Sequence, residues 1–152
     1  MKKIYIILLA IVAIVVILLV LNTYLERGTF EEIVFNKYVE NDVFTYMEIK
    51  GDEGERSTED QEKIEELISY LNNVKLKERS YRLVAEDNKH LRVNLSNKGR
   101  SEVLYIVIDK INVNIIYKTT SLEYKGEELR KEYKITDKDF DIEKIQEIYD
   151  SL

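Results

Sequence analysis

The N-terminal segment places the strongest constraint on this chain, because Ile4 to Leu21 contains no charged and no strongly polar side chain. Eighteen residues of α-helix extend about 27 Å, close to the ~30 Å hydrocarbon core of a bilayer. A helix satisfies its own backbone hydrogen bonds, which lipid cannot do, so the run predicts a transmembrane helix. The alternative is a core helix of a soluble protein. Such a helix normally keeps a polar stripe, which this run lacks.

The residues after the run distinguish an uncleaved anchor from a cleaved signal. A cleaved secretory signal needs small residues one and three positions before the cut, and Val20 to Leu25 offers no such pair. A lipoprotein signal would need a cysteine, and the sequence contains none. We therefore predict an uncleaved signal anchor over residues 1–25.

Basic residues set the predicted orientation. Lys2 and Lys3 precede the apolar run, whereas residues 26–32 carry three acidic side chains and one basic side chain. Since the flank richer in Lys and Arg stays in the cytoplasm, we expect a single-pass protein of the cell membrane. Its N-terminus would be cytoplasmic and its C-terminal domain would lie outside.

Composition excludes several classes of function. The absence of cysteine excludes thiolate nucleophiles, thiolate metal sites and disulfides. The formal charge is -6, and -8 without Lys2 and Lys3. Nucleic-acid binding depends on Lys and Arg that neutralise phosphates, so we do not expect a nucleic-acid partner. A chain of 152 residues with one anchor leaves material for one further domain.

Two helices are predicted from apolar residues at helical spacing. The first carries the stripe Ile64, Leu67, Ile68 and Leu71. Thr58 and Gln61 would begin it as a capping box. The second lies at the C-terminus and carries Ile142, Ile145, Ile148, Tyr149 and Leu152. Its N-cap is Asp139 or Asp141.

Alternation predicts strands over residues 43–49, 74–76, 91–95, 103–108, 111–117 and 133–135, with a loop over 119–130. Phe30–Tyr38 fits both helix and strand spacing, and we favour a strand. The fold class is therefore α+β: an N-terminal transmembrane helix followed by a mostly antiparallel sheet with two helices packed on one side. Residues 26–29 would be a linker and residues 30–152 an extracytoplasmic domain.

Few residues suggest chemistry. Asp137, Asp139 and Asp141 have the spacing that begins a calcium loop, but the sixth and twelfth positions lack its Gly and Glu. We interpret these acids as a turn and a helix N-cap. His90 is the single histidine, which excludes a multi-histidine zinc site, and it is predicted as a surface residue. The sequence holds no serine-nucleophile motif and no glycine-rich phosphate loop. We assign no catalytic, metal or cofactor-binding residue.

Tyrosines in the predicted strands form the one candidate partner surface. They are Tyr105, Tyr117, Tyr124 and Tyr133. Tyrosine beside Lys and Arg is common in protein interfaces. Tyrosine also packs well in half-buried strands, so a purely structural role stays open.

The order of these elements resembles that of small membrane-anchored or lipoprotein-type envelope proteins of Gram-positive bacteria, on the pattern of Ile64–Leu71, Tyr105–Tyr117 and Asp141–Tyr149. The cysteine of the lipoprotein members is absent. The resemblance implies an anchored extracytoplasmic protein and transfers no site residue. We expect a non-catalytic module that binds another envelope protein. The alternatives are a hydrolase of wall or lipid-linked material with a dispersed Asp/Glu pair and a small-ligand sensor domain.

Overall fold

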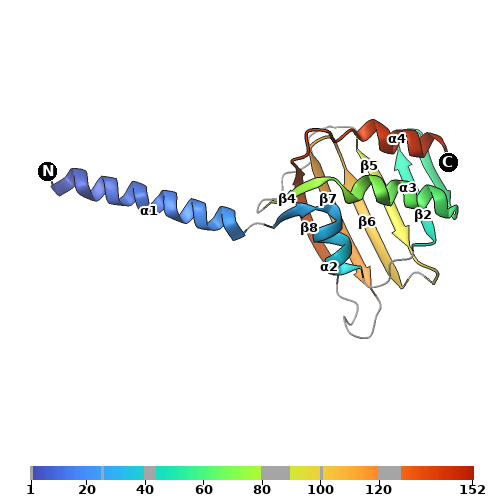
Figure 1. Ribbon diagram of the computed structural model, residues 1–152, viewed down its shortest axis with the longest axis horizontal. Helices are drawn as coiled ribbons and strands as arrows, with labels where there is room; N and C mark the ends of the chain where they lie inside the picture. The colour runs from blue at the N-terminus through green and yellow to red at the C-terminus, as the bar shows by residue number, and fades with distance from the viewer. Residues whose placement is uncertain (1, 25, 40–43, 80–89, 100, 120–127) are drawn as a thin grey trace.

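The computed structural model describes residues 2–24, 26–39, 44–79, 90–99, 101–119 and 128–152. Within these residues the chain forms an N-terminal helix, α1 (Lys2–Tyr24), and an α+β domain beyond it (Figure 1). The predicted α+β class is confirmed. Among the described residues, no helix combines the length and the apolar character that crossing a membrane requires.

The domain is built on one antiparallel sheet of eight described strands, in the order β1-β4-β8-β7-β6-β5-β2-β3. The strands are β1 (Arg27–Thr29), β2 (Tyr46–Gly51), β3 (Gly54–Thr58), β4 (Lys75–Glu78), β5 (Leu91–Ser96), β6 (Glu102–Ile108), β7 (Asn112–Thr119) and β8 (Glu128–Ile135). Strands β5 to β8 follow one another as neighbours. β1 and β4 continue the sheet beside β8, and β2 and β3 continue it beside β5.

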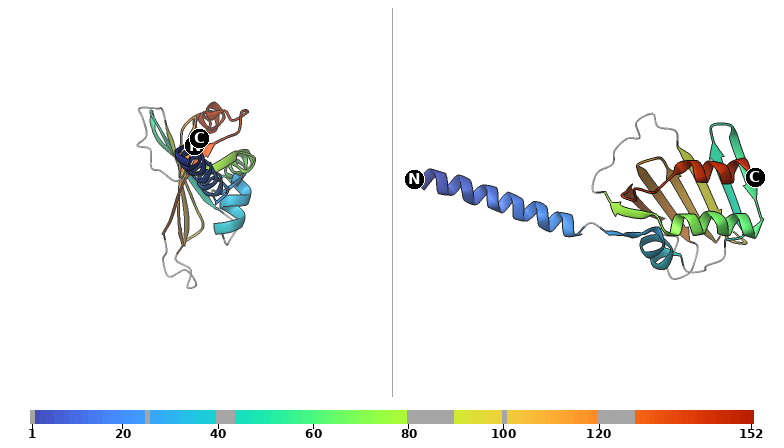
Figure 2. Two further views of the ribbon diagram at one scale, coloured as in Figure 1. Left: turned by 90° about the vertical axis from the view of Figure 1, so that its left-hand side faces the viewer. Right: turned by 45° about the horizontal axis from the view of Figure 1, so that its top comes forward.

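The helical segments of the domain cover one face of this sheet. They are the π-helical η1 (Glu31–Phe35), α2 (Asn36–Tyr38), α3 (Gln61–Asn72) and α4 (Ile142–Asp150). Seen along the sheet, all of them lie on the same side, and no described helix covers the opposite face (Figure 2). The prediction of two helices packed on one side is confirmed for α3 and α4.

The core lies between the sheet and these helices. Strand alternation sends Leu91, Val93 and Leu95 of β5 to this side, and each is at most 2% exposed. From the helix side, Ile64 and Leu67 of α3 are both 0% exposed. The apolar stripe of the first predicted helix is therefore its buried face.

The segment Phe30–Tyr38 is helical, so the favoured strand prediction was wrong. Phe30, Ile33 and Val34 recur at helical spacing and are all buried. The burial of this i, i+3, i+4 set against the core outweighs the β-propensity of the branched and aromatic residues. The predicted linker is also part of the fold, since Arg27–Thr29 forms β1 and pairs with β4.

The first helix begins later than the predicted capping box. Thr58 ends β3, and its hydroxyl accepts a hydrogen bond from the backbone N–H of Asp60 at 3.0 Å. Asp60 is the N-cap, because its carboxylate accepts from the backbone N–H of Glu62 at 3.0 Å. Strand β8 is longer than predicted and begins at Glu128, while residues 120–127 of the predicted loop lie outside the described set.

Candidate binding site on the open face of the sheet

The sheet face that no helix covers is called the open face below. Strand register places its side chains in rows across the sheet. One row runs Glu48, Asn94, Tyr105 and Ile116, and the next runs Lys50, Arg92, Val107 and Asn114. These residues come from β2, β5, β6 and β7. Segments that are far apart in the sequence therefore meet on one surface.

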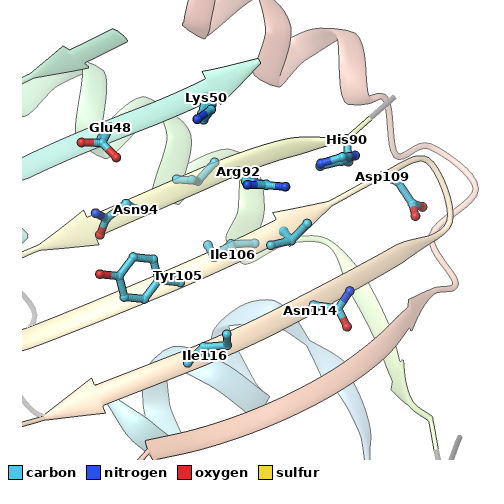
Figure 3. A pocket seen from close by; sticks show the side chains of 12 residues that line it. Glu48, Lys50, His90, Arg92, Asn94, Tyr105, Ile106, Asp109, Asn114 and Ile116 are labelled. Carbon is cyan, nitrogen blue, oxygen red and sulfur yellow. The ribbon is translucent and has the colours of Figure 1, made fainter. Parts of the chain in front are cut away.

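A hollow of about 580 Å³ lies on the open face (Figure 3). It is lined by Glu48, Lys50, His90, Arg92, Val93, Asn94, Tyr105, Ile106, Val107, Asp109, Asn114 and Ile116. His90 is exposed at one end of the hollow, as predicted for a surface residue. The volume falls within the ~300–1,000 Å³ range of small-molecule sites.

Apolar and aromatic side chains form the centre of the hollow. Tyr105 is 39% exposed, and the Lys118 ammonium lies 6.0 Å from the centroid of its ring. Val107 and Ile116 are half-buried beside it. An exposed aromatic ring with apolar neighbours and a nearby cation is a composition typical of protein interfaces.

Two cations border this centre, and Glu55 on β3 is the cross-strand neighbour of one of them, Lys50. Lys50 and Arg92 are cross-strand partners on β2 and β5, and both are exposed. Among the described residues, neither side chain forms an ion pair or hydrogen bond. Beside them, the Oδ1 atom of Asn94 is buried and has no hydrogen-bond partner. A buried, unpaired acceptor costs about 1–3 kcal/mol, so this edge of the hollow has unsatisfied polar groups.

The two carboxylates that line the hollow have separate hydrogen-bond partners. Glu48 accepts a hydrogen bond from the Tyr46 hydroxyl at 3.2 Å. Asp109 is 7% exposed and accepts the backbone N–H groups of Ile111 and Asn112 at 2.6 and 2.7 Å. Strand spacing and register separate the two backbones by about 16 Å, and each carboxylate bonds to groups on its own strand or turn. Among the described residues, no group of three or more His, Asp or Glu could hold a metal ion.

The three predicted tyrosines that the structure describes do not share a surface. Tyr105 lies on the open face, but Tyr117 is 5% and Tyr133 is 1% exposed, and both belong to the core. The predicted partner surface is wrong for these two residues, because Tyr117 has the strand parity of the buried Val113. Tyr124 lies outside the described residues. Lys50, Arg92 and Asn94 were missed because only the β2–β5 pairing brings them together.

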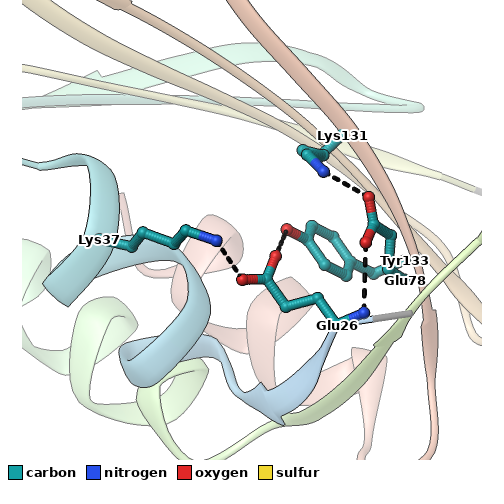
Figure 4. Close-up of polar contacts among 5 residues, drawn as sticks. All are labelled: Glu26, Lys37, Glu78, Lys131 and Tyr133. Atoms are coloured by element: carbon teal, nitrogen blue, oxygen red, sulfur yellow. Dashed lines mark hydrogen bonds and ion pairs between the residues drawn. The ribbon is translucent and has the colours of Figure 1, made fainter. Parts of the chain in front are cut away.

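A second polar group, the junction cluster, joins the start of the domain to the sheet (Figure 4). It consists of Glu26, Lys37, Glu78, Lys131 and Tyr133. Lys37 pairs with Glu26, and Lys131 pairs with Glu78. The Tyr133 hydroxyl donates to Oε2 of Glu26 at 3.2 Å, and the Glu26 backbone N–H donates to Oε2 of Glu78 at 3.2 Å.

Burial and neighbouring charges shift the pKa values of three side chains in the junction cluster. Burial, together with the Glu26 carboxylate, raises the pKa of the Tyr133 hydroxyl. Burial alone would raise the pKa of Glu78, but hydrogen bonds from Lys131 and the Glu26 backbone hold it below its ordinary value. The hydrogen bond to Glu78 raises the pKa of Lys131. The cluster is thus a mutually stabilised structural network.

Comparison of the chain with models of known families, with curated proteins and with solved structures finds no match. Function must therefore be inferred from the open face, the junction cluster and the apolar helix α1.

Proposed function

We propose that the chain is a non-catalytic module that α1 anchors in a membrane and that binds another envelope protein through the open face. The main support for this proposal is the exposure of the apolar side chains of α1. Its described apolar side chains from Tyr5 to Val20 are between 45% and 75% exposed. The helix extends away from the domain (Figure 1). So large an exposed apolar surface is unfavourable in water and is matched by lipid.

The length of the apolar run supports insertion across the membrane. The eighteen residues from Ile4 to Leu21, taken from the sequence, would extend about 27 Å as a helix, close to the ~30 Å of hydrocarbon. The side chains of Ile4, Ile6, Leu19 and Leu21 lie outside the described set. The run defined by the sequence is therefore longer than the part whose side chains are described.

Charge on the two sides of α1 supports a domain outside the cell. Lys2 and Lys3 precede the helix, and the residues after it are acidic on balance. The resemblance to anchored envelope proteins points in the same direction. Protease added to intact protoplasts should digest the domain of the full-length chain, and full protection of the domain would refute the orientation. N-terminal sequencing that begins after Leu21 would refute the anchor.

The composition of the open face supports a protein partner. Antiparallel sheets commonly leave one face in solvent, so an uncovered face alone carries no functional weight. The specific feature is the exposed ring of Tyr105 beside Val107 and Ile116, in the same hollow as the exposed cations Lys50 and Arg92. Aromatic and arginine side chains are the residue types that dominate binding energy at interfaces.

Photo-crosslinking in the native membrane tests this use of the open face. A photoreactive amino acid at position 105 of the full-length chain should give one stoichiometric crosslinked product. The same amino acid at Lys138, an exposed residue before α4, should give none. Tyr105→Ala should abolish capture of that product by an affinity-tagged chain. Equal crosslinking at both positions, or none at position 105, would contradict a partner on the open face.

A small-ligand sensor is the second candidate, favoured by the volume of the hollow. The two functions differ in what stabilises the purified chain. A sensor should show a rise in Tm with a small molecule alone, whereas the binding module should need its protein partner.

A further inference from the structure

We propose that Lys50 and Arg92 form a carboxylate-binding site, and that the partner docks there with an acidic peptide segment carrying an apolar side chain beside its carboxylate. The inference rests on the proposed function, since it names the chemistry of the segment that meets the open face. Figure 3 shows the two cations side by side at one edge of the hollow.

The two cations are placed to bind one anion together. Side chains of directly opposed residues have Cβ atoms about 4.5–5.5 Å apart, and like charges in such a pair repel each other. Glu55 lies opposite Lys50 on β3, yet the two do not form an ion pair. A carboxylate between Lys50 and Arg92 would relieve the repulsion. Arg92 would supply the paired N–H donors that match carboxylate geometry.

The distribution of charge directs an acidic partner to this face. The chain carries a net charge of -6. The exposed sides of α3 and α4 carry six acidic residues against Lys63 and Lys144, namely Glu62, Glu65, Glu66, Glu143, Glu147 and Asp150. The helical layer therefore repels an acidic segment. On the open face Glu48, Glu55 and Asp109 lie near the two cations, and none of the three pairs with them. The Lys50–Arg92 pair attracts the acidic segment, which favours one orientation of approach.

The neighbours of the cations favour a peptide over an inorganic anion. Val107 follows Arg92 in the same row, and Tyr105 lies in the adjacent row. Together they give an apolar side chain a place beside the bound carboxylate. The Oδ1 atom of Asn94, which has no hydrogen-bond partner, would accept a backbone N–H from the peptide. A peptide supplies the carboxylate, the apolar group and the N–H, whereas free phosphate supplies only the anion.

The position of the pair argues against the headgroups of the anchoring membrane as the anion. α1 joins the domain at β1, one edge of the sheet. Strand β2, which carries Lys50, lies six interstrand steps away in the sheet order. At ~4.8 Å per step this is about 29 Å. The site therefore faces molecules other than the lipid next to α1.

Titration of the full-length chain in zwitterionic detergent micelles, followed by backbone amide NMR, tests the site. The probes are the blocked peptide acetyl-Phe-Glu-Leu-amide, its Gln analogue and inorganic phosphate. We expect the Glu peptide to cause saturable shifts at Lys50, Arg92 and Tyr105, and the Gln peptide to bind roughly fivefold or more weakly. Lys50→Gln and Arg92→Gln should each weaken binding of the Glu peptide by roughly threefold or more. Lys138→Gln should leave the affinity for that peptide unchanged.

Equal binding of the Glu and Gln peptides, or absence of shifts at Lys50 and Arg92, would overturn the carboxylate site. Phosphate that binds as tightly as the Glu peptide would overturn the choice of a peptide. The native crosslink separates this failure from failure of the proposed function. A crosslink at position 105 that survives in Lys50→Gln and Arg92→Gln leaves the module intact and removes the site. Loss of the crosslink in both variants, with normal folding by amide NMR, supports the site.

Discussion

The hydroxyl of Tyr133 donates a hydrogen bond to the carboxylate of Glu26, 3.2 Å away and 107 positions earlier in the chain (Figure 4). Lys37 pairs with the same carboxylate. Tyr133 is almost fully buried in β8, so the residue that precedes β1 is tied to the interior of the domain. The connection between α1 and the sheet is a built part of the fold.

Tyr133→Phe should lower the free energy of unfolding by about 1–2 kcal/mol. The substitution removes the hydroxyl from a charged acceptor and keeps the ring, and hydrogen bonds to charged groups contribute about 1.5–3 kcal/mol when buried. Glu26 keeps 20% side-chain exposure, which reduces this figure. Urea unfolding of the full chain in neutral detergent measures the effect. Tyr105→Phe on the open face should change stability by less than about 0.5 kcal/mol; an equal loss there would discredit the Glu26 contact.

The stability that Tyr133 confers should decline at alkaline pH. Its pKa is raised in the folded state, chiefly by burial and then by Glu26. The contribution is therefore complete below the ordinary tyrosine pKa of about 10 and is lost as pH rises above it, because the unfolded chain ionises first. Unfolding measured from pH 8 to 12 should show wild type and Tyr133→Phe converging above about pH 10. A constant gap over that range would show that the hydroxyl pKa is not raised.

Glu78→Gln should destabilise the domain at neutral pH and have less effect in acid. The folded-state pKa of Glu78 is lowered by Lys131 and the Glu26 backbone against the opposing effect of burial. A lowered carboxyl pKa gives stability that is present above about pH 4.3 and is lost as pH falls through the folded value. We expect a loss of about 0.5–1.5 kcal/mol at pH 7 and convergence below about pH 4. Glu65→Gln, on the exposed side of α3, should show no such convergence.

Leu67→Ala should cost about 2–5 kcal/mol, the range for truncation of a fully buried leucine. Leu67 is 0% exposed and faces the sheet from the middle of α3. Ser69→Ala, on the solvent side of the same helix, should stay within about 0.5 kcal/mol. Thermal unfolding of both variants compares the two faces. A loss below about half a kcal/mol for Leu67→Ala would show that this face of α3 does not pack in the core.

Asp141→Ala should destabilise the domain by about 0.5–2 kcal/mol through loss of an N-cap. The Asp141 carboxylate accepts from the backbone N–H of Glu143 at 3.0 Å. The sequence left Asp139 and Asp141 as alternative caps, and the structure selects Asp141. Asp139→Ala is therefore the control and should change stability little. A larger loss of stability for Asp139→Ala than for Asp141→Ala in a denaturant titration would show that Asp141 is not the N-cap of α4.

The buried faces of the central strands and of α3 could be predicted from the sequence, because apolar residues recur there with the period of a strand or a helix. Helical spacing places Ile64 and Leu67 on one apolar stripe, and both are buried. Phe30–Tyr38 was misassigned because short segments satisfy both periods and tertiary burial decides between them. The site on the open face could not be predicted from the sequence. Lys50 and Arg92 lie together because β2 pairs with β5, and residue spacing does not determine strand order.

Strand order also sets when the chain can finish folding. Among the described strands β1 pairs with β4 alone, for example Arg27 with Lys77, and β4 has β8 as its other neighbour. Hairpins such as β5–β6 and β6–β7 close between successive segments, whereas β1 requires a distant contact. During synthesis, which begins at the N-terminus, β1 therefore cannot join the finished sheet until β8 has been made and has paired with β4. Truncations before β8 would leave β4 with an unpaired edge open to association with other chains.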